Sequence, residues 1–296
     1  MKKYTYGIFA AALLVAFMAA TGLVTKAVEA AVAACTTEVI TEADIARQAE
    51  NTPPTQNWVY YTRGSDAAAF RSGPGAPQFG TGSFEITTPT GADKGTLFNY
   101  DHVNTLLSQV NQISYSTYRR AGDAQQVAAI NLQVDVNGAA PGGFTTLVFE
   151  PVYNTAQGTV VNGEWQTWDA YSGGNAIWWS SNPIPGAPNR DTFVTLASIV
   201  AANPNAVIVG GVGINQGSGN PGLTTAIDAF TFGTSAECFT YNFELNDVVE
   251  PQVPMTKDDC KNDRWKTLVD SEGNSFKNQG QCVAFVASGG KSGKKK

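Results

Sequence analysis

Ile130-Asn131-Leu132-Gln133-Val134-Asp135-Val136 and Thr145-Thr146-Leu147-Val148-Phe149-Glu150-Pro151-Val152-Tyr153 are the two runs that decide the fold. The first alternates apolar and polar residues, and the second is rich in β-branched and aromatic ones, which are patterns typical of β-strands. Asn137-Gly138 and Pro141-Gly142-Gly143 lie between them and favour a turn, because asparagine and glycine tolerate positive φ. The pattern predicts strand, turn and strand.

Four of the six tryptophans follow shortly afterwards, in Glu164-Trp165-Gln166-Thr167-Trp168-Asp169 and Trp178-Trp179. We expect a tryptophan-bearing strand here, so that Asn131 to Trp179 forms an antiparallel meander inside a β-sandwich. Trp165 and Trp168 are three residues apart, and the other two are adjacent. Each pair should therefore divide between the two faces of its strand.

The composition favours many short strands. Of 296 residues, 30 are glycine and 14 are proline, while 43% are hydrophobic and only 15% are charged. Such a density of turn residues suits a β-protein, and one sandwich domain can contain about 200 residues. We predict an all-β fold, a two-sheet antiparallel jelly-roll sandwich over residues 35–250 with one or two short helices.

Other segments fit this architecture. Gly82–Thr87 and Gly95–Tyr100 should pair as a hairpin, and Phe193–Ala202 should form a short helix. Gly210-Gly211-Val212-Gly213 superficially resembles a phosphate-binding loop, but no lysine follows it. We therefore predict a strand that another part of the chain approaches closely.

The N-terminus has the pattern of a secretory signal peptide over residues 1–34. Met1-Lys2-Lys3 is basic, Ile8 to Val24 is apolar, and small alanines follow. The expected location is therefore secreted or at the cell surface. Two alternatives remain open: the apolar run could stay as an uncleaved anchor, and Val32-Ala33-Ala34-Cys35 resembles a bacterial lipobox, although charged residues separate it from the apolar region.

Export implies an oxidising compartment, so the four cysteines are expected to form disulfides. Three pairings are possible, and we favour Cys35 with Cys238 and Cys260 with Cys282. The first bond would join the first and last strands of the sandwich, which often lie side by side. Zinc is the competing explanation, but no Cys-x-x-Cys occurs and His102 is the sole histidine, so no metal is predicted.

The chain after the sandwich divides into three parts. Residues 251–256 are a proline-containing linker, and 257–288 form a small segment that needs its disulfide because it can bury little core. Residues 289–296 are predicted to be a disordered basic tail. Besides the signal or anchor segment, this tail is the expected point of contact with a membrane.

The net charge of the chain argues against nucleic acid as a partner. The whole chain carries −6, while residues 1–34 contribute +2 and residues 257–296 contribute +4, so residues 35–256 carry −12. Nucleic-acid binding needs basic surface that replaces counterions, and so acidic a body lacks it.

The order of the strand motifs resembles that of a known family. The motifs are Asn131–Asp135, Val148–Tyr153, Trp165–Ala170, Trp178-Trp179, Ile227–Gly233 and Tyr241–Glu244. They resemble an uncharacterised family of exported bacterial jelly-roll proteins, and are more loosely similar to concanavalin A-like lectin/glucanase folds and carbohydrate-binding modules. The resemblance implies a fold but no catalytic residue. The segment from Cys260 to Val283 is similar to short tails on other exported bacterial proteins.

The tryptophans suggest a function. An exposed indole gives the flat apolar surface on which the C–H face of a pyranose can stack. We predict an exported, non-catalytic module that binds extracellular or envelope polysaccharide through an aromatic groove. The predicted ligand-binding residues are Trp165, Trp168, Trp178, Trp179, Tyr171 and Asn175, with Asn182 as a further polar neighbour. If the indoles all pack inside, a structural or adhesive cell-surface protein is the alternative.

A glycoside hydrolase or polysaccharide lyase is the second alternative. The carboxylates expected nearest a concave face are Glu85, Asp135, Glu150, Asp169 and Asp228. A glycosidase needs two of them about 5–9.5 Å apart. The Glu-x-Asp-x-x-Glu signature of many glucanases on this fold is absent, so no catalytic residue is predicted.

No cofactor is predicted either. Asp135-Val136-Asn137-Gly138 is similar to half of a calcium loop, but Ala139-Ala140-Pro141 follows and offers too few oxygen ligands. Turn formation is therefore favoured over calcium binding. His102 has no serine or cysteine around it in the pattern of a catalytic triad.

Overall fold

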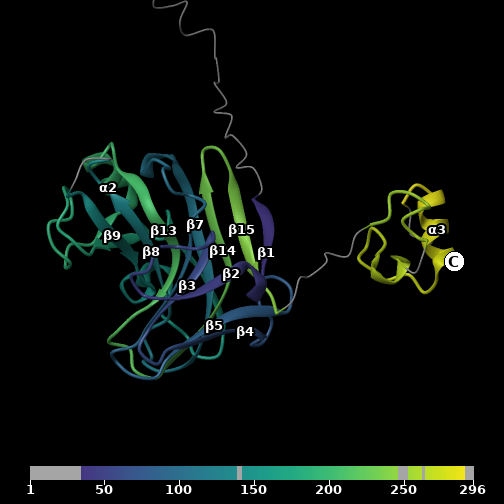
Figure 1. The fold of residues 1–296 in the computed structure, drawn as a ribbon, viewed down its shortest axis with the longest axis horizontal. Coiled ribbons are helices and arrows are strands. Elements are labelled where there is room, and N and C mark those ends of the chain that lie inside the picture. The colour runs from purple at the N-terminus through teal and green to yellow at the C-terminus, as the bar shows by residue number, and fades with distance from the viewer. Residues whose placement is uncertain (1–34, 139–141, 246–252, 262–263, 291–296) are drawn as a thin grey trace, which may run out of the picture. The chain divides into compact units, whose positions relative to one another are not determined.

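The computed structural model describes residues 35–138, 142–245, 253–261 and 264–290. The predicted signal peptide, part of the linker and the last six residues of the basic tail lie outside these ranges. Between Thr36 and Phe243, the described residues form fifteen strands in two sheets (Figure 1). The predicted all-β jelly-roll sandwich is confirmed.

The first sheet, here called sheet A, is built around the twelve-residue strand β14. One edge of β14 pairs along its length with β7, which in turn pairs with β10. The other edge is shared: β5 and then β4 lie beside its first half, and β15 and then β1 beside its second half. The strands are β1 (Thr36–Ile40), β4 (Ala67–Ser72), β5 (Gly82–Thr88), β7 (Val110–Ala121), β10 (Trp165–Asp169), β14 (Leu223–Thr234) and β15 (Cys238–Phe243).

The second sheet, sheet B, has the strand order β12-β11-β9-β8-β13-β6-β3-β2. Its strands are β2 (Ile45–Ala49), β3 (Trp58–Arg63), β6 (Lys94–Asn99), β8 (Ala129–Asp135), β9 (Phe144–Phe149), β11 (Ile177–Ser180), β12 (Val194–Thr195) and β13 (Val207–Gln216). β8 and β9 form the predicted hairpin. Each sheet also contains one parallel pair, β1 with β15 and β2 with β3, so the sheets are mixed rather than wholly antiparallel.

Helices are few and short. α2 (Leu196–Ala202) lies within the predicted helical segment and begins where the Thr195 hydroxyl accepts a hydrogen bond from the Ser198 amide. α3 (Gln279–Ala287) belongs to the C-terminal segment. The 3₁₀ turns are η1 (Glu42–Asp44), η2 (Leu107–Gln109), η3 (Pro151–Tyr153), η4 (Thr155–Gln157) and η5 (Arg264–Thr267).

Two pairing predictions were wrong. β5 and β6 are consecutive but lie in different sheets, β5 beside β14 and β6 beside β3 and β13. The tryptophan-rich region is not one strand of a meander, because β10 pairs with β7 in sheet A whereas β11 pairs with β9 in sheet B. Alternation of apolar residues determines which face of a strand is buried, but it does not determine the partner strand.

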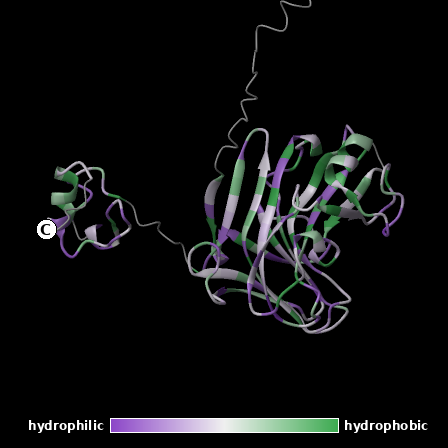
Figure 2. Cartoon of the chain, turned by 180° about the vertical axis from the view of Figure 1, so that it is seen from behind, coloured by the Kyte–Doolittle hydropathy of each residue, from purple (hydrophilic) through white to green (hydrophobic). Residues whose placement is uncertain are grey.

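The core lies between the two sheets and is formed by every second residue of their strands. Hydrophobic and hydrophilic residues accordingly follow one another along the strands in Figure 2. The largest side chains in this core are aromatic, and they include Tyr115, Phe149, Trp168, Trp178 and Phe230. On sheet B, the opposite faces of the same strands carry the candidate site.

Both predicted disulfides are confirmed. Cys35–Cys238 joins the start of β1 to the start of β15 across 203 residues of sequence. Cys260–Cys282 lies in the C-terminal segment, where it packs with Leu268, Phe276 and Phe285 in a small separate core. Within the described ranges, no helix is both long and apolar enough to cross a membrane.

Candidate functional site

The outward face of sheet B carries a hollow of about 740 Å³. Leu132 of β8 and Leu147 of β9 point into the core, so the alternate residues Asn131 and Val148 point outward and form the floor of this hollow, which we call the groove. Trp179 on β11 continues the floor. Cavities of 300–1,000 Å³ are typical of small-molecule sites, so the groove is large enough to hold a ligand.

The walls of the groove come from loops at its sides. The β13–β14 loop, residues 217–220, forms one wall, and Tyr153, Arg190 and Phe193 form another. The rings of Tyr153 and Phe193 lie against each other, with their centroids 4.6 Å apart. The groove therefore combines a floor of mixed polarity with aromatic side chains at the end near Trp179.

Trp179 is held by two charged neighbours. Its indole Nε1 donates a 2.7 Å hydrogen bond to the Glu150 carboxylate, and the Arg190 guanidinium lies 4.7 Å from the centre of its ring. Burial raises the pKa of the Glu150 carboxyl, although the Trp179 hydrogen bond and the Arg190 charge oppose this rise. An apolar ring, an acceptor and a five-donor cation therefore lie together.

The other cations that line the groove are paired. Lys94 Nζ lies 2.8 Å and Arg63 Nη1 lies 3.3 Å from the carboxylate of Glu50. A single carboxylate between two cations offsets one of their two positive charges, and Asp191 adds a further negative charge to the lining. The groove thus presents mainly amide, hydroxyl and aromatic groups, with its charges internally opposed.

The structure places two of the predicted ligand-binding tryptophans in the core. Trp168 is wholly buried and donates from Nε1 to the Thr117 hydroxyl at 2.8 Å. Trp178 is also wholly buried and donates to the Ala170 carbonyl at 2.8 Å. Since neither ring reaches the surface, neither can stack on a sugar, and we leave both out of the proposed site.

Trp165 lies on the outward face of the other sheet. Its Nε1 donates to the Pro74 carbonyl at 2.7 Å, and its ring meets that of Tyr118 edge-on, 5.7 Å between centroids. Gly75 also lies beside both rings. The Trp165 indole therefore fastens the loop at residues 73–82 onto sheet A, and Trp165 does not line the groove.

The predicted polar neighbours lie outside the groove. Tyr171 is 38% exposed on the β10–β11 loop, and Asn175 occupies a positive-φ turn of the same loop. Asn182 donates from its side chain to the Phe144 carbonyl. Of the predicted ligand-binding residues, the structure brings Trp179 to the groove.

The five candidate carboxylates are dispersed. Glu85 pairs with Arg120 at 2.7 Å on sheet A, and Asp228 is buried under the loop at residues 73–82. Asp135 and Asp169 each accept a hydrogen bond from a backbone amide two residues later, as turn residues do. Glu150 is the member of this set that lines the groove.

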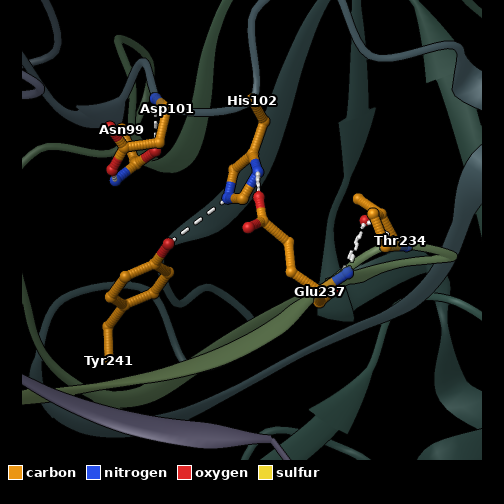
Figure 3. Close-up of polar contacts among 7 residues, drawn as sticks. Asn99, Asp101, His102, Thr234, Glu237 and Tyr241 are labelled. Atoms are coloured by element: carbon orange, nitrogen blue, oxygen red, sulfur yellow. Dashed lines mark hydrogen bonds and ion pairs between the residues drawn. The ribbon is translucent and has the colours of Figure 1, made fainter.

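His102 also has a structural setting. It is buried, with Nε2 3.3 Å from the Tyr241 hydroxyl and Nδ1 3.9 Å from Glu237, and these contacts are drawn in Figure 3. Its ring packs 4.4 Å from that of Phe232. Burial lowers the pKa of His102, although the charges of Glu237 and Asp101 oppose the decrease. These contacts join the turn after β6 to β14 and β15.

Sequence reasoning missed Asn131, Tyr153, Arg190 and Phe193 as groove residues. The polar side chain of Asn131 on the outward face of a predicted strand was an available signal. Phe193 was predicted only as the start of a helix, and Arg190 lies in the glycine- and proline-containing stretch before it, for which no element was predicted. Nothing in their local sequence indicates that they approach Trp179.

No family model matches the sequence, and no curated protein matches it. Among solved structures, it is similar to the family 11 carbohydrate-binding module of a cellulosomal cellulase of Clostridium thermocellum, with 12% identity and a TM-score of 0.36 over 61% of this chain and 89% of that one. A second is the same kind of module in complex with a β-1,3-1,4-mixed-linked tetrasaccharide, with 10% identity and a TM-score of 0.33 over 65% and 93% of the two chains. With identities and TM-scores this low, the function has to be argued from the groove itself.

Proposed function

We propose that this protein is an exported, non-catalytic module that binds polysaccharide in the groove on sheet B. The observation that supports it most directly is Trp179, an indole on the outward face of a sheet inside a hollow of about 740 Å³. A tryptophan on this face cannot contribute to the core between the sheets. Its accessible surface is suited to a ligand with an apolar face.

The groups around Trp179 match the chemistry of a sugar. A pyranose has C–H groups that stack on an aromatic ring and hydroxyls that both donate and accept hydrogen bonds. Glu150 supplies an acceptor at the edge of the ring, and Arg190, whose guanidinium lies over the ring, supplies donors. Asn131 is only 7% exposed, and its side-chain oxygen has no hydrogen-bond partner among the described residues. A buried amide oxygen left unpaired is costly, so a hydroxyl from a ligand or water would stabilise it.

Export is supported by the two disulfides, which persist in oxidising compartments. The signal-peptide pattern of residues 1–34 agrees with this location. A secreted or cell-surface protein encounters polysaccharides directly. Location and groove chemistry therefore favour the same class of ligand.

The test is binding of the mature chain to immobilised cellulose, xylan, mannan and mixed-linkage β-glucan, compared between wild type and Trp179→Ala. We expect retention on at least one polysaccharide and its loss in the variant. Tyr171→Ala is the matched control, because it removes an exposed ring outside the groove. No retention on any of the four, or equal retention of Trp179→Ala, would overturn the proposal, and release of reducing sugar would contradict a non-catalytic role.

A further inference from the structure

A second hollow lies on the same outward face of sheet B. Its volume is about 480 Å³, and its lining includes the rings of Tyr61, Phe98 and Tyr100, with Pro53 and Pro54 at its side. The Tyr61 and Tyr100 rings meet Phe98 edge-on at 6.4 and 6.3 Å. This aromatic cluster is separate from the core between the sheets. Sheet B therefore carries aromatic groups at two places on its outward face.

The two hollows adjoin each other. Lys94 lines both of them. Thr96 of the second hollow donates a 3.1 Å hydrogen bond to Asn215 of the first. On β8, Asn131 faces the first hollow and Gln133, two residues later, faces the second.

The strand registers place the ends of this path in one row. Trp179 pairs with Val148, Val148 with Asn131, Asn131 with Gly213, and Gly213 with Phe98. Four strand-to-strand steps at about 4.8 Å each separate the two rings by roughly 19 Å. The residues between them are a valine, an asparagine and a glycine, which are all smaller than the two aromatic residues. The middle of the row is therefore a depression, and its two ends are aromatic.

We propose that the two hollows are the ends of one binding path, occupied by an unbranched, uncharged polysaccharide that lies across the strands from Trp179 to the Phe98–Tyr100 cluster. The inference rests on the proposed function and specifies its ligand. A single sugar ring would occupy only one end, whereas a chain of several rings would contact both. A branch would meet the loops that form the walls.

The charges favour an uncharged chain. The charged residues that line the two hollows are three cations (Lys94, Arg63 and Arg190) and three carboxylates (Glu50, Glu150 and Asp191), and Glu50 pairs with both Lys94 and Arg63. Arg190 lies on the Trp179 ring next to Glu150. Residues 35–256 carry a net charge of −12, which would repel an acidic polysaccharide.

The test compares chain lengths by titration calorimetry, with cello-, xylo- and manno-oligosaccharides of two and six units. We expect the six-unit sugar of the preferred series to bind at least about tenfold more tightly than the two-unit sugar. Tyr100→Ala should remove this advantage, because it deletes one of the rings at the far end of the path. Val209→Lys is a second variant that blocks the path: Val209 lines the second hollow and is 39% exposed, so this substitution leaves the core intact.

The outcomes distinguish this inference from the proposed function. Equal affinities for both lengths, or a length advantage that survives both variants, would overturn the inference, while loss of binding in Trp179→Ala would still support the groove. If none of the oligosaccharides binds the wild-type protein, the inference fails, whereas the proposed function still depends on retention by the four polysaccharides. Tighter binding of six-unit oligogalacturonate than of every uncharged sugar would overturn the choice of an uncharged chain.

Discussion

Trp178 and Trp179 are consecutive on β11 and lie on opposite sides of sheet B. The Trp178 indole is wholly buried and donates to the Ala170 carbonyl, whereas the Trp179 indole faces the groove and donates to Glu150. Period-two geometry therefore assigns one ring to the core and the other to the surface. The two rings should respond differently to the same substitution.

We expect Trp178→Ala to lower the free energy of unfolding by about 3–5 kcal/mol, because it leaves a large cavity in the core. Trp179→Ala should cost less than about 1.5 kcal/mol, since its ring lies outside the core and its losses are one hydrogen bond and the contact with the Arg190 guanidinium. Urea unfolding of both variants measures the difference. Equal losses would mean that Trp179 is a second structural residue, which would weaken its assignment to a ligand.

The glycines of β13 make room for side chains of the neighbouring strands. A Cβ added at Gly211 would lie 2.3 Å from Cγ of Phe98, and one at Gly210 would lie 2.2 Å from the Gln133 side-chain oxygen. Gln133 in turn accepts a 2.9 Å hydrogen bond from the Gly211 amide. The predicted close approach to this strand is present, and it positions two residues of the second hollow.

Gly211→Ala should therefore destabilise the protein by about 1–3 kcal/mol, because the Phe98 ring has to move. The matched control is Gly91→Ala, where an added Cβ has no atom within 4 Å. Thermal unfolding of the two variants should show a lower midpoint for Gly211→Ala alone. A midpoint equal to that of wild type would show that Phe98 moves freely, in which case the aromatic cluster is not a fixed part of the face.

Asp228 lies buried beneath the loop at residues 73–82 and holds it through a hydrogen bond. Its carboxylate accepts hydrogen bonds from the amides of Phe79 at 2.9 Å and Phe243 at 3.2 Å. Nearby, Glu244 accepts one from Thr81 at 2.9 Å. Burial, with a smaller contribution from the Glu244 charge, raises the pKa of Asp228 from 3.8 to about 6, although three backbone hydrogen bonds oppose the rise.

This raised pKa predicts a pH dependence of stability. The folded protein binds the Asp228 proton more tightly than the unfolded chain, so this contribution is complete below pH 3.8 and is lost as the pH rises through about 6. Relative to Asp228→Asn, wild type should gain about 2 kcal/mol of unfolding free energy between pH 7.5 and 4.5. Urea unfolding at both values measures the gain. A constant difference between the two proteins would contradict the raised pKa.

Local sequence patterns predicted the strands well where period two was clear, as in β8, or where β-branched and aromatic residues were dense, as in β9. The Cys35–Cys238 disulfide was predicted because the first and last strands of a sandwich often meet. The patterns did not reliably predict which strands pair with each other. β5 and β6 are joined by a short link, yet that link passes from one sheet to the other, and Asp93 holds it by accepting hydrogen bonds from the amides of Ser65 and Thr90.

The groove, too, could be predicted only in part from local sequence patterns. Alternation predicted that one ring of the Trp178–Trp179 pair would face the surface, but it did not predict which one. Its partners Glu150 and Arg190 are 29 residues before it and 11 residues after it, and their contacts depend on how β9 and a loop are placed around β11. A periodic sequence pattern does not predict such a placement. The sequence therefore indicated an aromatic site, but not that Glu150 and Arg190 would contact its ring.

The last prediction concerns the disulfides, which close loops of very different length. Replacing Cys35 and Cys238 together by serine frees a cross-link that spans 203 residues and should cost about 5 kcal/mol of sandwich stability in the chain-entropy model. Replacing Cys260 and Cys282 opens a 22-residue loop in a separate small core, so the sandwich should keep its stability. Hydrogen exchange of the β13 and β14 amides reports on the sandwich alone. Faster exchange in the second variant as well would show that the C-terminal segment stabilises the sandwich, contrary to the separate cores.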